Sequence, residues 1–133
     1  MARVLIIEDH PALASVLHFN LRAAGYEPSI ATDGREALTK CLSEEPFDLI
    51  LLDHQLPGML GLEVCATLRQ AAAYRDVPVV MLTAKQHEFD PDQLDAEYGI
   101  CNVYGKPFSP SEVIHWVTNF LDSREGRVDA LAP

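Results

Sequence analysis

Five short runs of apolar residues recur along the chain, each separated from the next by a segment long enough for a helix. The strongest runs are rich in branched aliphatic residues and are nearly continuous in apolar character, without regular alternation with polar residues. This pattern is typical of parallel β-strands that are buried on both faces of a sheet. The predicted strands cover residues 3–8, 28–31, 47–52, 77–82 and 101–104.

The segments between these runs have the periodicity and the end signals of amphipathic helices. Gly25 and Gly99 follow two of them as C-terminal caps, and capping-box patterns begin at Asp33 and Ser109. A βα unit is therefore repeated five times, (βα)5, in about 120 residues, which favours one parallel sheet with right-handed crossovers. We predict an α/β fold with a single doubly wound sheet and helices on both faces. The predicted helices cover residues 12–24, 36–43, 62–74 and 90–99, with a last helix that opens at residues 109–112.

The charge balance restricts the partners that we expect. Lys and Arg number 10 against 20 Asp and Glu, for a net charge of -10. Nucleic-acid and anionic membrane surfaces are bound through clustered cations, so this balance argues against both. No apolar run approaches the roughly 20 residues of a membrane span, and the acidic N-terminal sequence is unlike a signal peptide.

The cysteines point to the compartment. Cys41, Cys65 and Cys101 are an odd number without metal-ligand spacing. We expect reduced thiols in the core of a cytoplasmic protein. We further expect one domain over residues 1–122, followed by a polar tail or linker stub over residues 123–133.

Chemically active residues follow four of the predicted strands. Glu8 and Asp9 end the first strand and Asp53 ends the third, while Thr83 and Lys106 follow the fourth and fifth. Functional groups collect beyond the carboxyl ends of the strands in such a sheet, so these side chains are expected to converge. Mutually repelling carboxylates with hard oxygen ligands favour a Mg²⁺ ion.

This combination suits chemistry on a phosphoryl group. An aspartate can attack phosphorus as a nucleophile, with the metal and a lysine stabilising charge on the phosphoryl oxygens. Asp53 is the candidate nucleophile, because Glu8 and Asp9 are paired as metal ligands would be. The alternative is that Asp48 and Asp53 only bracket a strand and that the other two acids solvate a loop.

With these residues identified, the chain resembles the receiver domain of two-component response regulators over about residues 2–122. The resemblance depends on the order and spacing of four motifs, which are VLIIED at residues 4–9, LILLDHQLPGMLGLEV at residues 49–64, VMLTA at residues 80–84 and GKPF at residues 105–108. It implies the flavodoxin-like receiver fold with strand order 2-1-3-4-5. It also implies a phosphoacceptor signalling domain rather than an enzyme, with at most self-phosphorylation from small donors and auto-dephosphorylation.

The resemblance assigns roles residue by residue. Asp53 matches the phosphoacceptor, which takes its phosphoryl group from a histidine kinase or a phosphotransfer protein. Glu8 and Asp9 match the Mg²⁺-binding acids, and the backbone carbonyl of Gln55 would complete the metal site with Asp53. Thr83 matches the hydroxyl residue that contacts the phosphoryl group. Lys106 matches the site lysine, with a cis bond to the proline that follows.

The resemblance also implies an output. Phosphorylation would change the face made by the fourth helix, the fifth strand and the fifth helix, which would contact an output protein or effector domain and is a candidate homodimer contact. The family usually has an aromatic residue three positions before the lysine, where this chain has Val103. Tyr104 is expected on the opposite face of the strand, so it does not replace that ring.

Other functions stay open. A receiver-like module that binds partners without phosphorylation is one: the acids, Thr83 and Lys106 argue against it, but Val103 leaves room for it. An aspartyl phosphatase would need an acid where the chain has Gln55, and a flavodoxin-like electron carrier would need a phosphate loop where it has acids. Of the histidines, His10 and His54 adjoin the acids and are expected to line the mouth of the site.

Overall fold

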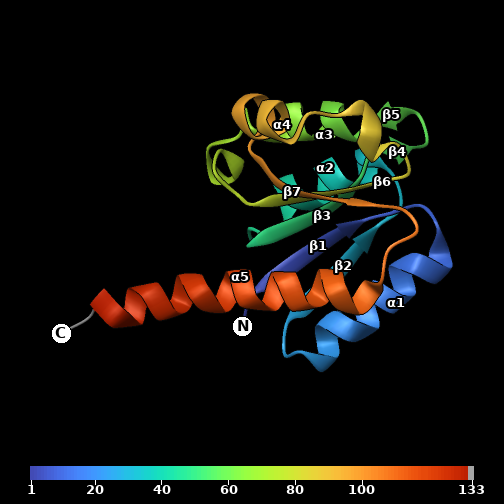
Figure 1. The fold of residues 1–133 in the computed structure, drawn as a ribbon. Helices are drawn as coiled ribbons and strands as arrows, with labels where there is room; N and C mark the ends of the chain where they lie inside the picture. The colour runs from blue at the N-terminus through green and yellow to red at the C-terminus, as the bar shows by residue number, and fades with distance from the viewer. Residues whose placement is uncertain (132–133) are drawn as a thin grey trace.

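A five-stranded parallel sheet forms the centre of the protein in a computed structural model that describes the backbone of residues 1–131 and the side chains of residues 1–124 (Figure 1). The strand order is β2-β1-β3-β6-β7, so the predicted order 2-1-3-4-5 is confirmed. All neighbouring pairs in this sheet run parallel. The strands are β1 (Arg3–Ile7), β2 (Glu27–Ala31), β3 (Leu49–Asp53), β6 (Val79–Thr83) and β7 (Ile100–Gly105).

Helices cover both faces of this sheet, as predicted for a doubly wound α/β fold (Figure 1). Helices α1 and α5 pack together on one face, and α2, α3 and α4 cover the other. The predicted caps form at α2 and α4: the Asp33 carboxylate accepts a hydrogen bond from the Glu36 N–H, and Gly99 has a φ of 69°. The helices are α1 (Pro11–Ala23), α2 (Gly34–Ser43), α3 (Gly61–Leu68), α4 (Pro91–Tyr98) and α5 (Pro110–Leu131).

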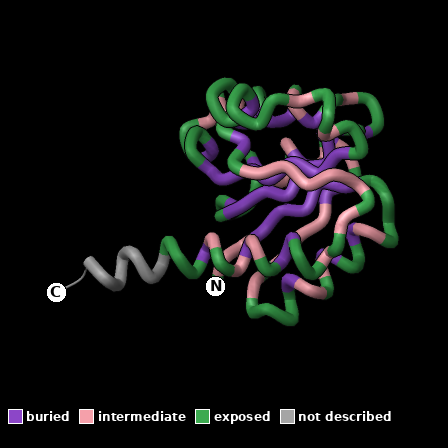
Figure 2. Tube along the Cα trace, in the orientation of Figure 1, coloured by how far each residue is buried: buried purple, intermediate pink, exposed green. Residues whose placement is uncertain are grey.

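The near-continuous apolar runs arise because the central strands face two cores. Along β1, Leu5 and Ile7 point into the core under α2, α3 and α4, whereas Val4 and Ile6 point into the core under α1 and α5. Strand β3 has no exposed residue, and Figure 2 shows the central strands as the most continuously buried part of the chain. Burial on both faces removes the polar alternation that a solvent-facing sheet has.

A small hairpin follows β3 and was not predicted. Strands β4 (Gln55–Leu56) and β5 (Met59–Leu60) pair in antiparallel fashion around Gly58, whose φ of 73° favours glycine. Gly61 then begins α3 in close contact with the end of β3: a Cβ there would lie 2.6 Å from the Asp53 carbonyl oxygen. The hairpin thus folds the chain back directly onto the residue that ends the third strand.

The prediction of one helix over residues 62–74 is wrong at its C-terminal end. Helix α3 ends at Leu68, and a separate 3₁₀ helix, η1 (Ala72–Tyr74), follows. The Arg69 guanidinium donates hydrogen bonds to the backbone carbonyls of Tyr98 at 2.9 Å and Val77 at 2.7 Å. These contacts hold the chain in a turn, so tertiary structure overrides the good helix propensity of the sequence.

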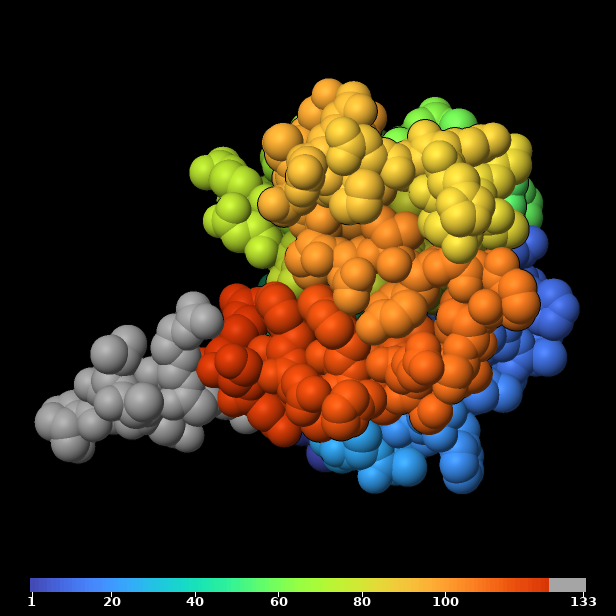
Figure 3. Space-filling view, viewed as in Figure 1, coloured from blue at the N-terminus to red at the C-terminus, as the bar shows by residue number. Residues whose placement is uncertain are grey.

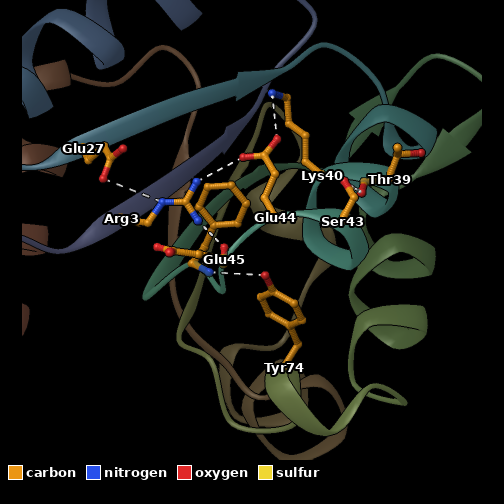
Figure 4. Close-up of polar contacts among 9 residues, drawn as sticks. Arg3, Glu27, Thr39, Lys40, Ser43, Glu44, Glu45 and Tyr74 are labelled. Atoms are coloured by element: carbon orange, nitrogen blue, oxygen red, sulfur yellow. Dashed lines mark hydrogen bonds and ion pairs between the residues drawn. The ribbon is translucent and has the colours of Figure 1, made fainter.

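Tyr74 anchors η1 from the other side. Its ring is fully buried, and its hydroxyl oxygen accepts a hydrogen bond from the Phe47 N–H at 3.2 Å. Figure 4 shows the Tyr74 hydroxyl directed toward this backbone segment. Continuing the helix through Tyr74 would place this ring elsewhere.

Arg3 organises the edge of the sheet where the strands begin (Figure 4). Its guanidinium lies over the Phe47 ring, 4.4 Å from the centroid, and donates to the Glu44 carboxylate at 3.0 Å and to the Glu45 carbonyl. Glu27 lies 3.8 Å from its Nε. The charges at this edge therefore pair with one another, far from the acids at the carboxyl ends of the strands.

Helix α5 continues past residue 122, where the sequence predicts the domain to end. Its backbone is helical to Leu131, so the predicted tail begins as an extension of this helix. The division of the chain into residues 1–122 and 123–133 stays a prediction. Among the residues that the structure describes, no helix has both the length and the apolar character for crossing a membrane.

The three cysteines are free thiols. Cys41 and Cys65 are buried, as predicted, but Cys101 is exposed, so its assignment to the core is wrong. Strand β7 lies at the edge of the sheet and is less covered than the central strands. An apolar run in the sequence does not distinguish an edge strand from a central one.

Replacing Arg69 with alanine is expected to lower the free energy of unfolding by about 2–3 kcal/mol, because several backbone carbonyls lose a charged donor. Urea unfolding measures this change. Arg75→Ala is the matched control, since Arg75 is exposed on the same loop. Equal losses in the two variants would contradict the role given to Arg69.

Candidate functional site

The carboxyl ends of four parallel strands bring the predicted site residues together. Glu8 follows β1, Asp53 ends β3, Thr83 ends β6 and Lys106 follows β7. The Lys106 ammonium lies 2.7 Å from Glu8 Oε1 and 3.3 Å from Asp53 Oδ2. Residues separated by up to 98 positions in the sequence therefore form one charged group.

Backbone N–H groups orient the two buried carboxylates. Glu8 Oε2 accepts a hydrogen bond from the His10 N–H at 3.0 Å, and Asp53 Oδ1 accepts one from the Gln55 N–H at 3.1 Å. In each case the donor lies two residues after the acid, in the turn that leaves the strand. Each carboxylate thus has one oxygen fixed by the backbone and the other directed at Lys106.

Asp9 brings a third carboxylate to this site. One oxygen from each of Glu8, Asp9 and Asp53 lies within 4.8 Å of the others, and Glu8 and Asp53 are buried while Asp9 is exposed. Unit charges at that distance repel by about 3 kcal/mol per pair at an effective dielectric constant near 20. Lys106 offsets only part of this repulsion. Hard carboxylate oxygens open to solvent on the Asp9 side fit a Mg²⁺ ion.

Burial and charge shift the titration of the ion pair. Burial raises the pKa of Glu8, against the opposing hydrogen bonds from Lys106 and the His10 N–H. Burial alone would lower the pKa of Lys106, but the hydrogen bond to Glu8 and the charge of Asp53 outweigh it, so the pKa is raised. The ammonium therefore stays charged at neutral pH beside the carboxylates.

The loops after β6 and β7 are joined at the site. The Lys106 N–H donates to the Thr83 carbonyl at 2.8 Å, and Thr83 Oγ1 accepts from the Lys85 N–H at 3.0 Å. The bond between Lys106 and Pro107 is cis, as the resemblance implied. The hydroxyl and the ammonium thus come from two strand ends that are hydrogen-bonded to each other.

The two neighbouring histidines differ from each other. His10 caps α1 and lines a hollow of about 410 Å³ beside Lys106, Pro107 and Phe108, as expected for a residue at the mouth of the site. His54 instead is buried against Phe89, with ring centroids 5.0 Å apart. The expectation that His54 lines the mouth is therefore wrong, because its side chain is buried against Phe89.

His54 has a buried ring nitrogen, Nδ1, that makes no hydrogen bond to the described residues. Burial lowers the pKa of the imidazole, the charge of Lys85 lowers it further, and Glu88 opposes both. Nothing in the sequence around His54 and Gln55 indicates that the His54 side chain is buried.

Val103 and Tyr104 lie on opposite faces of β7, as predicted. Val103 packs against the core under α2, α3 and α4, and Tyr104 packs against the core under α1 and α5 near Phe108. The aromatic ring thus does not reach the face where Val103 lies. Tyr104 does not substitute for a ring at position 103.

With this geometry in place, comparison with known proteins identifies the family. Residues 4–118 match the response regulator receiver domain family. The chain belongs to this family.

Relatives of known name support the assignment. The alkaline phosphatase synthesis transcriptional regulatory protein PhoP of Bacillus subtilis is 44% identical over 111 residues, which are 84% of this chain and 45% of PhoP. The chain spans about half the length of the curated relatives that it matches.

Solved structures agree in fold. The chemotaxis response regulator CheY4 of Vibrio cholerae has a TM-score of 0.79 at 32% identity, covering 90% of this chain and 98% of that one. The response regulator TrrA of Thermotoga maritima, solved in complex with Mg²⁺-BeF, has a TM-score of 0.73 at 30% identity, with the same coverage of 90% and 98%.

Replacing His54 with leucine is expected to stabilise the protein by about 1 kcal/mol at pH 8, because it removes a buried nitrogen without a partner. Urea unfolding in the presence of EDTA measures this gain. His87→Ala is the control, since His87 is exposed on the same segment that His54 contacts.

The same variant carries a pH dependence. Folding lowers the pKa of His54, so below its ordinary value of about 6.5 the unfolded chain binds a proton that the native protein does not. As the pH is lowered, protonation of His54 in the unfolded chain therefore decreases the stability of the wild type. Leucine does not titrate, so the stability advantage of the His54→Leu variant should grow as the pH is lowered from about 7.5 to about 5.5. An advantage that shrinks over this range would contradict the assignment.

Proposed function

We propose that this chain is the phosphoacceptor module of a two-component phosphorelay, in which Asp53 accepts a phosphoryl group. The observation that carries the proposal is the convergence of Asp53 with two further carboxylates and the Lys106 ammonium at one edge of the sheet. An oxygen of Asp53 attacks phosphorus while the bond from phosphorus to a donor histidine nitrogen breaks. The products are an acyl phosphate on Asp53 and the free histidine of a histidine kinase or phosphotransfer protein.

The remaining site residues support this transfer. Glu8, Asp9, Asp53 and the backbone carbonyl of Gln55 would hold Mg²⁺, which when bound neutralises charge on the phosphoryl oxygens. Lys106 already faces Asp53 at 3.3 Å and supplies a second positive charge. Thr83 donates its hydroxyl hydrogen to a phosphoryl oxygen while its Oγ1 keeps the hydrogen bond from the Lys85 N–H.

The output belongs to the part of the surface formed by α4, β7 and α5. A phosphoryl group adds about -1.5 to -2 charges at the end of the sheet, where Thr83 ends β6, and the loop that leaves Thr83 leads directly to α4. We infer that this face contacts an output protein or an effector domain, or a second copy of the chain, in the cytoplasm. The curated relatives are about twice as long, which leaves room for an effector domain in the full proteins.

The complete set of acids, hydroxyl and lysine favours phosphorylation over a module that binds partners without it. An aspartyl phosphatase is less supported, because the residue two positions after Asp53 is Gln55, which cannot act as a general acid. Val103 changes the face of β7 and leaves the transfer chemistry intact.

Incubation with acetyl phosphate and Mg²⁺ is expected to add one phosphoryl group, measured as intact-protein mass. Asp53→Asn should abolish the adduct, because it replaces the nucleophile, and EDTA should reduce it strongly. Asp76→Asn, which changes an exposed acid away from the site, should leave it unchanged. Folded wild-type protein without any adduct would contradict the proposal and favour a phosphorylation-independent module.

A further inference from the structure

The segment that follows Thr83 lies against the end of β7. It contains the 3₁₀ helix η2 (Gln86–Glu88), and Thr83 pairs in register with Gly105. Figure 3 shows this segment in yellow, above the orange surface of the chain around the end of β7. Gly105 immediately precedes Lys106. The segment therefore follows the strand end that carries the hydroxyl and contacts the strand end that carries the ammonium.

The Gln86 side chain makes this contact through its amide. A Cβ at position 105 would overlap with all three terminal atoms of that amide, Cδ, Oε1 and Nε2. The glycines with positive φ are Gly25, Gly58 and Gly99, so the backbone at Gly105 does not require glycine. What glycine provides at position 105 is the space that the Gln86 amide occupies.

Phe89 anchors the other end of the same segment. Its ring packs edge-on against His54, the residue directly after Asp53. Between these anchors, His87 and Glu88 are exposed, and so is Lys85, directly before Gln86. The contacts of residues 84–89 with the rest of the fold thus include the Phe89 ring, which also packs against the core under α2, α3 and α4, and one flexible side chain, Gln86.

We infer that Gln86 is a positioning residue for the phosphoryl response: its contact with Gly105 holds residues 84–89 in the unphosphorylated arrangement and opposes the movement of Thr83 toward a phosphoryl group on Asp53. The inference rests on the proposed function. A contact made in one of two states favours that state by its own free energy, so removing it shifts the equilibrium toward the other state.

Two single variants break the contact from opposite sides. Gln86→Ala removes the amide, and Gly105→Ala displaces it at little cost to the fold, because the obstructing atoms are the end of a flexible side chain. Both should bind beryllium fluoride with Mg²⁺, a mimic of the acyl phosphate, more tightly than the wild type, on the order of fivefold. Amide hydrogen exchange over residues 84–89 should be faster in both variants without the mimic.

The double variant separates a shared contact from two unrelated effects. If Gln86 and Gly105 act through one another, the double variant should bind the mimic no more tightly than either single variant. Gln70→Ala, at an exposed glutamine outside the segment, should leave both affinity and exchange unchanged. Damage to the fold would weaken binding, so tighter binding identifies a positioning role.

The failures are distinguishable. A folded wild type that does not bind beryllium fluoride with Mg²⁺ would overturn the proposed function, and this inference with it. If the wild type binds the mimic, two results would overturn the role of Gln86 alone. One is that the single variants are unchanged in affinity and exchange, and the other is that their effects on affinity add in the double variant.

Discussion

The charged group made by Lys106, Glu8 and Asp53 is the interaction on which the site depends. Parallel strands end at one edge of the sheet, so each strand delivers its following residue to the same place. This arrangement concentrates carboxylates within 4.8 Å of one another, two of them buried. The Lys106 ammonium, with its pKa raised by the same acids, offsets part of the repulsion. The remaining imbalance is what makes the site suited to a divalent cation and a phosphoryl group.

The fold was largely predictable because burial on both faces leaves a signal within each strand. The apolar runs ending at Glu8 and before Asp53 could be placed from the sequence alone, and their order follows the receiver resemblance. The end of α3 could not, because Arg69 and Tyr74 stop the helix through contacts with residues up to 29 positions away. Helix propensity describes only the local part of that competition. The exposure of Cys101 was missed because an edge strand reads like a central one.

The convergence of the site residues was predictable because each lies at a strand end, where topology decides position. Side-chain orientation inside the loops was not. His54 packs against Phe89, although its neighbour Asp53 joins the acids. The sequence does not indicate why residue 105, before the lysine, is a glycine. The structure gives the reason, because a Cβ at this position would overlap with the Gln86 amide. Such contacts depend on how two loops pack, which no spacing in the sequence encodes.

The most direct test of the electrostatic account is the free energy of unfolding of the wild type and Asp53→Asn, measured with urea in EDTA and again in Mg²⁺. Asparagine removes one repelling charge, while Lys106 keeps its shorter contact with Glu8 at 2.7 Å. The account predicts that Asp53→Asn is more stable than the wild type in EDTA, and that Mg²⁺ stabilises the wild type much more than the variant. A variant that is less stable in EDTA and gains as much from Mg²⁺ would contradict it.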